Sequence, residues 1–495
     1  MPERRPGVEV LPETPSAEGL LDLLPAMEAA LGTRACLVGG YPRDLLMGRA
    51  SSPDVDVVLE QVDAELGARW LRSSWGRRGK VVSFERYGTA QIAFPIGAGG
   101  RFTVEFVRAR SEAYSPESRK PTVSPGTMEE DVLRRDFTIN TLLLSAQGEL
   151  LDPTGLGLAD IRRRLLRTPL APRLTFEEDP LRMLRAVRFA SQLDFELAPG
   201  VEEAIQEAAP RLRIVSRERV REELLKLLMG QRPSRGMELL HRTGLLLEIS
   251  PELEQMSGVE QGGYHLGDVL QHTALALDLS APSRQVRLAV LFHDVGKPST
   301  RQPAPGGPTF RGHAQVGAGM ARDVLRRLRF SAAETAQVAR LVELHMRPIQ
   351  YHSDWADSAV RRLWRDADDL IWDLLELARA DTKASSYPGT AELEELEGRL
   401  REVAADHPGG LRPPLGGNPL KEHFSLGDGP WIRRAQSQLV EAVLEGRLQP
   451  RDGEVAKPDA LRLLEEDRDS WWPRPGEAGS SEVGPAQDGV GHPPG

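Results

Sequence analysis

The sequence predicts an α+β protein, with a small mixed sheet and flanking helices first and all-α regions afterwards. Hydrophobic residues make up 40% of the chain and aromatic residues only 5%, which favours a helix-rich protein over an all-β one. Short apolar runs typical of strands lie within the first 155 residues, whereas helical spacing dominates later. Because 495 residues are too many for a single hydrophobic core, we expect two to four domains.

The bulk composition also indicates where the protein works. The single cysteine, Cys36, excludes an internal disulfide and favours a reducing compartment. It lies in an apolar run, so we interpret it as a core residue and not a nucleophile. The first seven residues contain no apolar signal segment, and no run reaches transmembrane length. We therefore expect a cytoplasmic protein without a membrane partner, and the sequence leaves the oligomeric state open.

The charge distribution is uneven along the chain. A formal net charge of −10 argues at first against a nucleic-acid partner. However, many arginines fall between residues 162 and 221, while acidic residues concentrate later, as in 392–397. Some of these arginines belong to solvated helix faces. The others predict a local basic surface that could bind phosphates.

A glycine-rich turn follows the first predicted strand, at residues 36–38. Gly39 and Gly40 would form a tight turn, and Pro42 suits the first turn of a helix. Backbone N–H groups at such a turn attract anions. Arg43 adds a guanidinium that suits phosphate oxygens. This stretch therefore predicts a phosphate cradle, although a double glycine alone is usually only a turn.

Two carboxylates follow in the next apolar run, at Asp54 and Asp56. Alternate residues of a strand share one face, so both side chains should point the same way. Neighbouring carboxylates repel unless a cation lies between them, and hard oxygen ligands suit Mg²⁺. The alternating run 102–107 predicts another strand that carries Glu105. Glu105 would complete the metal site or act as a base, or it is an ordinary exposed strand residue.

The other elements of this region follow from local patterns. Thr127 and Glu130 form a capping-box pattern that starts a helix. We also expect a helix at 17–31, strands at 80–84, 90–94 and 142–144, a polar loop at 109–126 and an exit turn at 151–155.

A basic helix begins near residue 180. Pro180 favours the first turn, with Asp179 as the N-cap. Three arginines recur at every third position and form one stripe: Arg182, Arg185 and Arg188. Spacing alone favours an ordinary amphipathic helix. The alternative is a site where Asp179 and the arginines face a nucleobase or its phosphates.

A histidine-rich constellation lies in the second half of the chain. Its imidazoles and carboxylates suit a divalent transition metal or Mg²⁺. The six candidate ligands are His272, His293, Asp294, His313, His345 and Asp381.

In their order and spacing, the motifs of the first half resemble the class II nucleotidyltransferases, that is, the bacterial CCA-adding enzymes and poly(A) polymerases. The matching segments are Gly39-Gly40, Asp54-x-Asp56, 134–140, 178–182 and 216–224. The resemblance covers roughly residues 35–230 and implies a catalytic head followed by a helical neck.

The resemblance also implies roles for single residues. Asp54 and Asp56 would hold Mg²⁺ ions, and Arg135 would contact the nucleotide phosphates together with the cradle of Gly39, Gly40 and Arg43. Asp136 would stabilise the junction between head and neck. Asp179 and Arg182 would read the incoming base in place of a nucleic-acid template, with Arg185 and Arg188 in support.

The histidine constellation resembles the HD phosphohydrolase superfamily. We therefore expect an all-α HD domain with a divalent metal whose identity and substrate stay open. The alternative is a degenerate HD fold that is kept for packing.

Together these patterns predict an enzyme that adds CCA, or part of it, to tRNA 3′ ends from CTP and ATP. One alternative is a poly(A) polymerase, and another is an HD phosphohydrolase with a non-catalytic RNA-binding head. The expected domains are a head at 17–155, a neck and body at 156–260, an HD domain at 261–390, a helical region at 391–470 and a disordered tail at 471–495.

Overall fold

The computed structural model forms two compact units, which we describe separately. Unit 1 comprises residues 1–254 and 327–329, and unit 2 comprises residues 255–326 and 330–495. The structure describes residues 15–49, 53–76, 79–84, 88–96, 100–113, 122–262, 267–305, 307–385, 390–406, 413–448 and 455–472.

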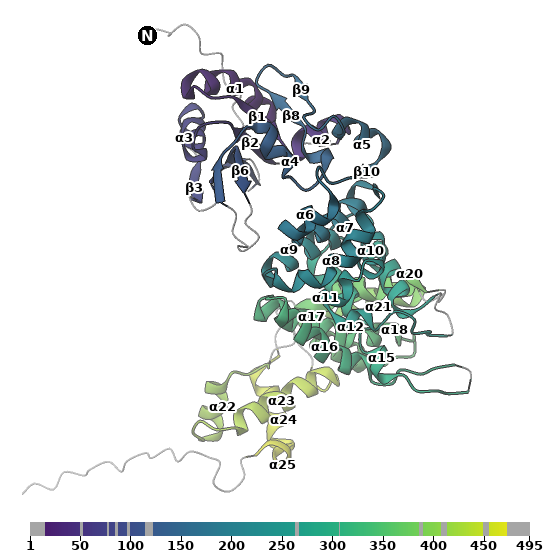
Figure 1. Cartoon of the computed structure of the whole chain (residues 1–495). Helices are drawn as coiled ribbons and strands as arrows, with labels where there is room; N and C mark the ends of the chain where they lie inside the picture. Colours follow the sequence, from purple (N-terminus) through teal and green to yellow (C-terminus); the bar gives the residue numbers. More distant parts are fainter. Residues whose placement is uncertain are drawn as a thin grey trace, which may run out of the picture. The chain divides into compact units, whose positions relative to one another are not determined.

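Unit 1 begins with a seven-stranded mixed sheet, which is the predicted head (Figure 1). The strand order is β3-β4-β5-β2-β1-β8-β9, and the pair β2–β5 is parallel. The strands are β1 Ala35–Val38, β2 Asp54–Leu59, β3 Lys80–Phe84, β4 Thr89–Ile96, β5 Gly100–Arg108, β8 Leu143–Ser145 and β9 Leu150–Leu151. The helices of the head are α1 Ala17–Leu31, α2 Gly40–Leu46, α3 Ala64–Ser74 and α4 Met128–Leu133, followed by a 3-10 turn at Thr138–Asn140.

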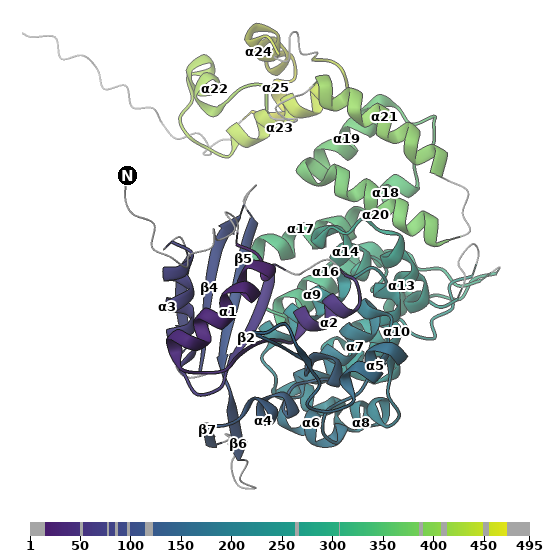
Figure 2. The same ribbon diagram turned by 90° about the horizontal axis from the view of Figure 1, so that it is seen from above.

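The two faces of this sheet carry different cores. Helices α1 and α3 cover one face, where they bury the odd-numbered residues of β2 such as Val55 and Val57 (Figure 2). On the other face, Cys36 packs with Met128 and Val132 of α4. Burial raises the pKa of the Cys36 thiol to about 11, so this side chain is a core residue as predicted. The even-numbered acids of β2 therefore lie on the α4 side.

Local patterns in the head were mostly correct, with two corrections. The capping box of Thr127 and Glu130 is confirmed, because each side chain accepts a hydrogen bond from the other residue's backbone N–H. The predicted loop at 109–126 is wrong at its two ends, because β6 Arg110–Ala113 and β7 Thr122–Pro125 form an antiparallel pair there; residues 114–121 lie outside the described residues. Helix α2 starts at Gly40, two residues before Pro42, so Gly40 belongs to the helix and not to the turn.

A helical neck and body completes unit 1. Helix α7 is central, because α6, α9 and α10 all pack against it. The helices are α5 Gly157–Arg163, α6 Pro172–Glu178, α7 Leu181–Leu193, α8 Val201–Ala208, α9 Arg217–Leu228, α10 Pro233–Arg242, α11 Leu245–Ile249 and α12 Pro251–Glu254. A 3-10 helix spans Ala209–Ile214, and β10 Leu165–Leu166 pairs with β11 Glu196–Leu197.

Unit 2 is helical throughout its described residues apart from isolated bridges. Helix α20 packs against α13, α14 and α21 and so forms the centre of the predicted HD domain. The helices are α13 Val269–Leu279, α14 Arg284–Phe292, α15 Lys297–Thr300, α16 His313–Arg327, α17 Ala332–Leu344, α18 Met346–Ile349, α19 Asp357–Ala367, α20 Ile371–Ala384 and α21 Thr390–Asp406, with a 3-10 turn at Asp368–Leu370.

The C-terminal helices of unit 2 form a hydrophobic cluster of their own. They are α22 Gly417–Phe424, α23 Trp431–Leu444, α24 Lys457–Glu466 and α25 Arg468–Trp471. Trp471 is 1% exposed and packs near Trp431, so the predicted disordered tail cannot begin at residue 471. Residues 473–495 of that predicted tail lie outside the described residues.

No helix in the described part of the chain has both the length and the apolar character needed to cross a bilayer.

Candidate active site

The predicted acids meet on one face of the sheet at the parallel pair β2–β5. Asp56 lies opposite Glu105 in the strand register, and Asp54 lies opposite Thr103. Burial raises the pKa of both Asp56 and Glu105, and the negative charges of the neighbouring acids raise it further. Sequence alternation therefore placed all three carboxylates on one face correctly, and Glu105 is not an isolated exposed residue.

The predicted turn lies directly against these acids. Gly39 has φ of +80°, a conformation that favours glycine. A Cβ atom at Gly39 would lie 2.9 Å from Asp56 Oδ2 and 3.4 Å from Arg135 Nη1. The positive charge of Arg135 opposes the rise in the Asp56 pKa, although burial dominates. The Gly39 turn, the Asp56 carboxylate and the Arg135 guanidinium thus lie side by side.

A second group of predicted residues lines a cavity of about 220 Å³ between the end of α4 and the start of α7. Four of its lining residues were predicted as nucleotide ligands: Arg135, Asp179, Arg182 and Arg185. Arg134, Asp136, Leu181 and Arg219 complete the lining. The structure therefore brings the phosphate-binding and base-reading candidates together in one cavity.

The side chains of this cavity are held in place by specific contacts. Arg182 donates to the carbonyl of Arg134 at 2.6 Å and pairs with Glu178 at 3.1 Å. Asp179 accepts from Arg219 at 2.8 Å through one carboxylate oxygen, and from the backbone N–H of Leu181 through the other. The predicted N-cap is wrong by one residue, because Asp179 ends α6 while Pro180 precedes α7.

Asp136 connects the head to the neck. It accepts from Arg185 Nε at 2.7 Å and is nearly fully buried. Burial alone would raise the pKa of Asp136, but the charge of Arg185 and the hydrogen bond from Asn140 lower it to about 2. The carboxylate is therefore ionised and paired at neutral pH.

Two of the arginines predicted as nucleotide ligands, Arg43 and Arg188, do not line this cavity. Arg43 is 7% exposed and donates to Asp44 and Asn140, while Arg188 pairs with Glu223 at 2.6 Å. Both arginines line a different cavity of about 310 Å³ next to Gln192. Their guanidinium groups therefore serve contacts within the protein.

Sequence reasoning missed three residues. Arg219 lines the cavity and Asn140 contacts Arg43 and Asp136, whereas Lys297 belongs to the histidine cluster of unit 2. Arg219 and Asn140 lie in segments that carried the resemblance, but only the fold reveals their partners. Lys297 lies three residues after Asp294, and this spacing was a usable signal because it places both on one side of a helical turn.

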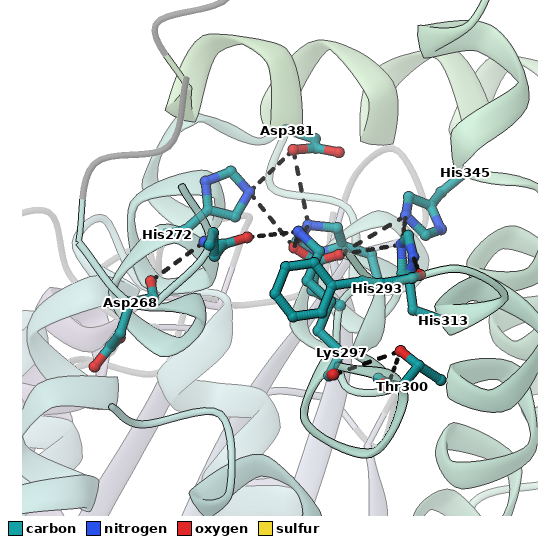
Figure 3. Close-up of polar contacts among 12 residues, drawn as sticks. Asp268, His272, His293, Lys297, Thr300, His313, His345 and Asp381 are labelled. Atoms are coloured by element: carbon teal, nitrogen blue, oxygen red, sulfur yellow. Dashed lines mark hydrogen bonds and ion pairs between the residues drawn. The ribbon is translucent and has the colours of Figure 1, made fainter. Parts of the chain in front are cut away.

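The six histidine and aspartate candidates of unit 2 form one cluster (Figure 3). His272 Nε2 lies 3.0 Å from Asp381 Oδ1, and His293 Nε2 lies 3.2 Å from Asp294 Oδ2. On the other side, His313 Nε2 lies 3.5 Å from Asp294 Oδ1. Asp294 thus lies between the imidazoles.

Three imidazoles of this cluster are oriented by the backbone. His293, His313 and His345 each place Nδ1 within 2.8 Å of a main-chain carbonyl three residues earlier. A proton on Nδ1 leaves the Nε2 lone pair directed into the cluster, which is the arrangement typical of metal-binding histidines.

The donor set fits a divalent metal. Ligand atoms of His272, His293 and Asp294 lie within 4.8 Å of one another, and so do those of Asp294, His313 and His345. Among the described residues, no group of three in the head satisfies this criterion. His293 Nε2 is buried and faces Asp294 Oδ2 at 3.2 Å and Asp381 Oδ1 at 3.8 Å, so it contacts the carboxylates that would share a metal with it.

Two imidazoles of the cluster have pKa values shifted in opposite directions. Burial alone would lower the pKa of His293, but the charges of Asp294 and Asp381 raise it to about 9, so a metal would replace a proton on this imidazole. Burial and the charge of His293 lower the pKa of His345 to about 3, so that imidazole is neutral and able to ligate.

The cluster opens into a cavity of about 680 Å³. Lys297, Arg311 and Arg347 line this cavity together with Asp294 and Asp381. Lys297 donates to Asp294 at 2.6 Å and to Gln261 at 2.5 Å. A metal-binding set beside three basic side chains suits a phosphate-bearing ligand.

Three segments of the chain match known domain families. Residues 35–167 match the poly A polymerase head domain, and residues 194–256 match a probable RNA- and SrmB-binding site of polymerase A. Residues 262–382 match the HD domain.

Two relatives match this chain over most of their own length. The A-adding tRNA nucleotidyltransferase of Deinococcus radiodurans is 34% identical over 87% of this chain and 94% of its own length. The CC-adding tRNA nucleotidyltransferase of Thermus thermophilus is 36% identical over 83% of this chain and 90% of its own length.

A solved structure shares the fold. The Bacillus stearothermophilus CCA-adding enzyme, crystallised with CTP, superposes with a TM-score of 0.62. It is 24% identical in sequence, and the match covers 91% of this chain and 97% of that one. The motifs of the head, the neck and the HD domain thus occur in one chain that its relatives match over nearly their full length, and this chain belongs to the tRNA nucleotidyltransferase family.

Proposed function

We propose that unit 1 transfers cytidylate or adenylate units from CTP or ATP to the 3′ end of tRNA, adding CCA or part of it. The observation that carries this proposal is the contact of Gly39 with Asp56 and Arg135, which puts paired acids beside a glycine turn and a phosphate-binding cation. The full-length relatives, which are named A-adding and CC-adding, support the same reaction.

Asp54 and Asp56 fit a Mg²⁺ site because both offer hard carboxylate oxygens on one face of β2. When bound, Mg²⁺ supplies positive charge that lowers the pKa of the tRNA 3′-hydroxyl and stabilises the departing pyrophosphate. The raised pKa of Asp56 reflects the cost of burying this carboxylate without a cation.

The protein's own side chains hold and orient the substrates. Arg135 would bind the triphosphate beside the Gly39 turn, where no Cβ atom obstructs the approach. Glu105, with its raised pKa, would accept the proton of the attacking hydroxyl. Asp179 and Arg182 would pair with the edge of the incoming base, since an acceptor and a planar donor can match a nucleobase without a template.

A test compares tRNAs that end before CCA and after CC, each with labelled CTP or ATP, followed by sequencing of the added tail. We expect defined addition of at most three nucleotides. Long adenylate tails on any RNA would instead support the poly(A) polymerase alternative. Absence of any incorporation, with retained phosphatase activity, would support the HD enzyme with a non-catalytic head.

We further propose that unit 2 is a metal-dependent phosphohydrolase. The observation that favours it is the complete set of six buried ligands beside the basic cavity. When bound, a divalent metal supplies Lewis acidity toward a phosphate ester. Lys297 would hold Asp294 in position, and Arg311 and Arg347 would bind the substrate phosphate.

Hydrolysis of p-nitrophenyl phosphate and bis-p-nitrophenyl phosphate, with Mg²⁺, Mn²⁺ or Ni²⁺ added in turn, tests this second activity. We expect turnover by the wild-type chain and by Asp56→Ala. Two outcomes would contradict this activity: turnover by His293→Ala that equals the wild-type turnover, or no turnover by the wild type with any of the metals. In either case the HD fold would have a structural role only.

A further inference from the structure

A buried polar chain connects helix α2 of the head to helix α7 of the neck. Arg43 Nη1 donates to Asn140 Oδ1 at 2.7 Å, and Asn140 Nδ2 donates to Asp136 Oδ1 at 2.9 Å. Asp136 Oδ2 then accepts from Arg185 Nε at 2.7 Å. Arg43, Asn140 and Asp136 are all less than 10% exposed. A single amide therefore joins a buried cation to a buried anion.

The orientation of this amide is fixed by its partners. Arg43 can only donate and an ionised Asp136 can only accept, so the Asn140 oxygen must face the arginine and its nitrogen the aspartate. Both hydrogen bonds involve a charged partner, which makes them stronger than neutral ones. Neither a carboxylate nor an apolar side chain at position 140 could satisfy both neighbours.

An aromatic ring of α7 closes the same arrangement. The guanidinium carbons of Arg188, Arg43 and Arg185 lie 4.0, 5.2 and 5.5 Å from the centre of the Phe189 ring. Phe137 contacts Phe189 edge-on at 5.9 Å. The ring face attracts cations, so Phe189 holds Arg43 toward the neck. This explains why Arg43 does not line the cavity of Arg135 and Asp179.

We infer that Arg43 and Asn140 are positioning residues, which keep the acid site of β2 in register with the base-reading residues of α7. This inference rests on the proposed nucleotidyl transfer. Gly39 lies next to Asp56, and α2, which starts at the following residue Gly40, carries Arg43. Asp179 and Arg182 flank the start of α7, whose Arg185 ends the polar chain. The chain Arg43–Asn140–Asp136–Arg185 therefore sets the separation between the triphosphate and base sites.

Loss of this register has a specific kinetic signature. A matching nucleotide is held at both its triphosphate and its base, whereas a non-matching one is held at its triphosphate alone. Loosening the register should therefore lower kcat/KM for the matching nucleotide more than for the other. A loss of folded protein lowers both values by one factor and leaves their ratio unchanged.

The experiment measures kcat/KM for the matching nucleotide, CTP or ATP, and for GTP. The variants are Arg43→Met, Asn140→Leu and the double variant, with Asn418→Leu on the exposed face of α22 as the control. We expect each single variant to lower the ratio about tenfold to a hundredfold, the effect of a lost hydrogen bond to a charged group. We expect the double variant to lower it no further, because both changes break one chain.

Two results would overturn the inference. An Arg43 that binds the triphosphate directly would lower kcat/KM for every nucleotide alike, with no change in the ratio. Independent roles would give a double variant whose loss is the product of the two single losses. If Asn140→Leu does not fold, Asn140→Asp replaces it, since it keeps the acceptor for Arg43 but sets a second carboxylate against Asp136.

A wild-type chain that adds no nucleotide would refute the proposed function but not this linkage. The midpoint of thermal unfolding then serves as the readout. Each single variant should lower the midpoint, and the double variant should lower it by clearly less than the sum. Additive shifts would contradict the linkage.

Discussion

The acid site of the head and the histidine cluster of unit 2 differ in how far neighbouring groups balance the negative charge of their carboxylates. In unit 2, four imidazoles surround Asp294, and Lys297 and His293 balance its charge. In the head, burial and mutual repulsion raise the pKa of Asp56 and Glu105, and Arg135 offsets this only in part.

This difference predicts that the two sites differ in when they bind a metal and in whether they retain it. A preformed cluster with oriented imidazoles is suited to keep an ion between turnovers. Two carboxylates that repel each other are stabilised most by a metal ion that arrives together with a nucleotide, because the phosphates supply the remaining metal ligands. The head should therefore bind its metal with the substrate, and unit 2 should retain its metal alone.

The largest expected effect comes from removing an acid of the head. Asp56→Ala should lower nucleotide addition about a thousandfold or more, because it removes charge that stabilises the transition state. Single-turnover incorporation of labelled CTP and ATP measures it. Phosphatase activity of the same variant should stay within twofold of wild type, and a parallel loss of both would show that the two sites are not independent.

The reciprocal change is His293→Ala. Its Nε2 lies beside the candidate ligands Asp294 and Asp381, so we expect hydrolysis of p-nitrophenyl phosphate to fall about a hundredfold or more. Nucleotide addition by this variant should remain near the wild-type rate. A collapse of addition while circular dichroism stays unchanged would contradict the separation of the sites.

Gly39→Ala should reduce nucleotide addition about a hundredfold, because the new Cβ would displace the Asp56 carboxylate 2.9 Å away. Gly148→Ala is the matched control. Gly148 has φ of +78°, close to the +80° of Gly39, but nothing lies within 4 Å of its Cβ position. Both variants place a Cβ atom at a positive φ, which strains the backbone by about 1–3 kcal/mol, but only the Cβ atom at Gly39 also meets a carboxylate. Equal activity losses would assign the effect to strain.

The sequence defined the head site well because its information is local. Alternation alone put Asp54 and Asp56 on one face, and the capping box of Thr127 depends on residues three apart. It could not reveal the contacts of Arg43 with Asn140 and Phe189, since these partners lie about 100 or more positions away in the sequence. The burial of Trp471 likewise depends on packing against α23, which no local pattern reveals.

The smallest expected effect concerns stability. Asp136→Asn should destabilise unit 1 by about 2 kcal/mol, the value of a charge-assisted hydrogen bond reduced because Arg185 is partly exposed. The folded pKa of about 2 lies below the usual 3.8. The stabilisation is therefore present above about pH 4 and disappears as the pH falls toward 2.

Native-state hydrogen exchange of the amides in β2 and α7 measures this difference between wild type and variant. Asp323→Asn, an exposed site on α16, serves as the control and should change stability by less than about 0.5 kcal/mol. A difference that grows on acidification would contradict the ionised, paired state of Asp136.

The divalent metal content of the purified protein after exhaustive dialysis tests the contrast between the two sites most directly. The wild type and Asp56→Ala should retain equal amounts, and His293→Ala should retain almost none, because only unit 2 holds a preformed cluster. Metal that is lost with Asp56→Ala, or kept by His293→Ala, would contradict this account.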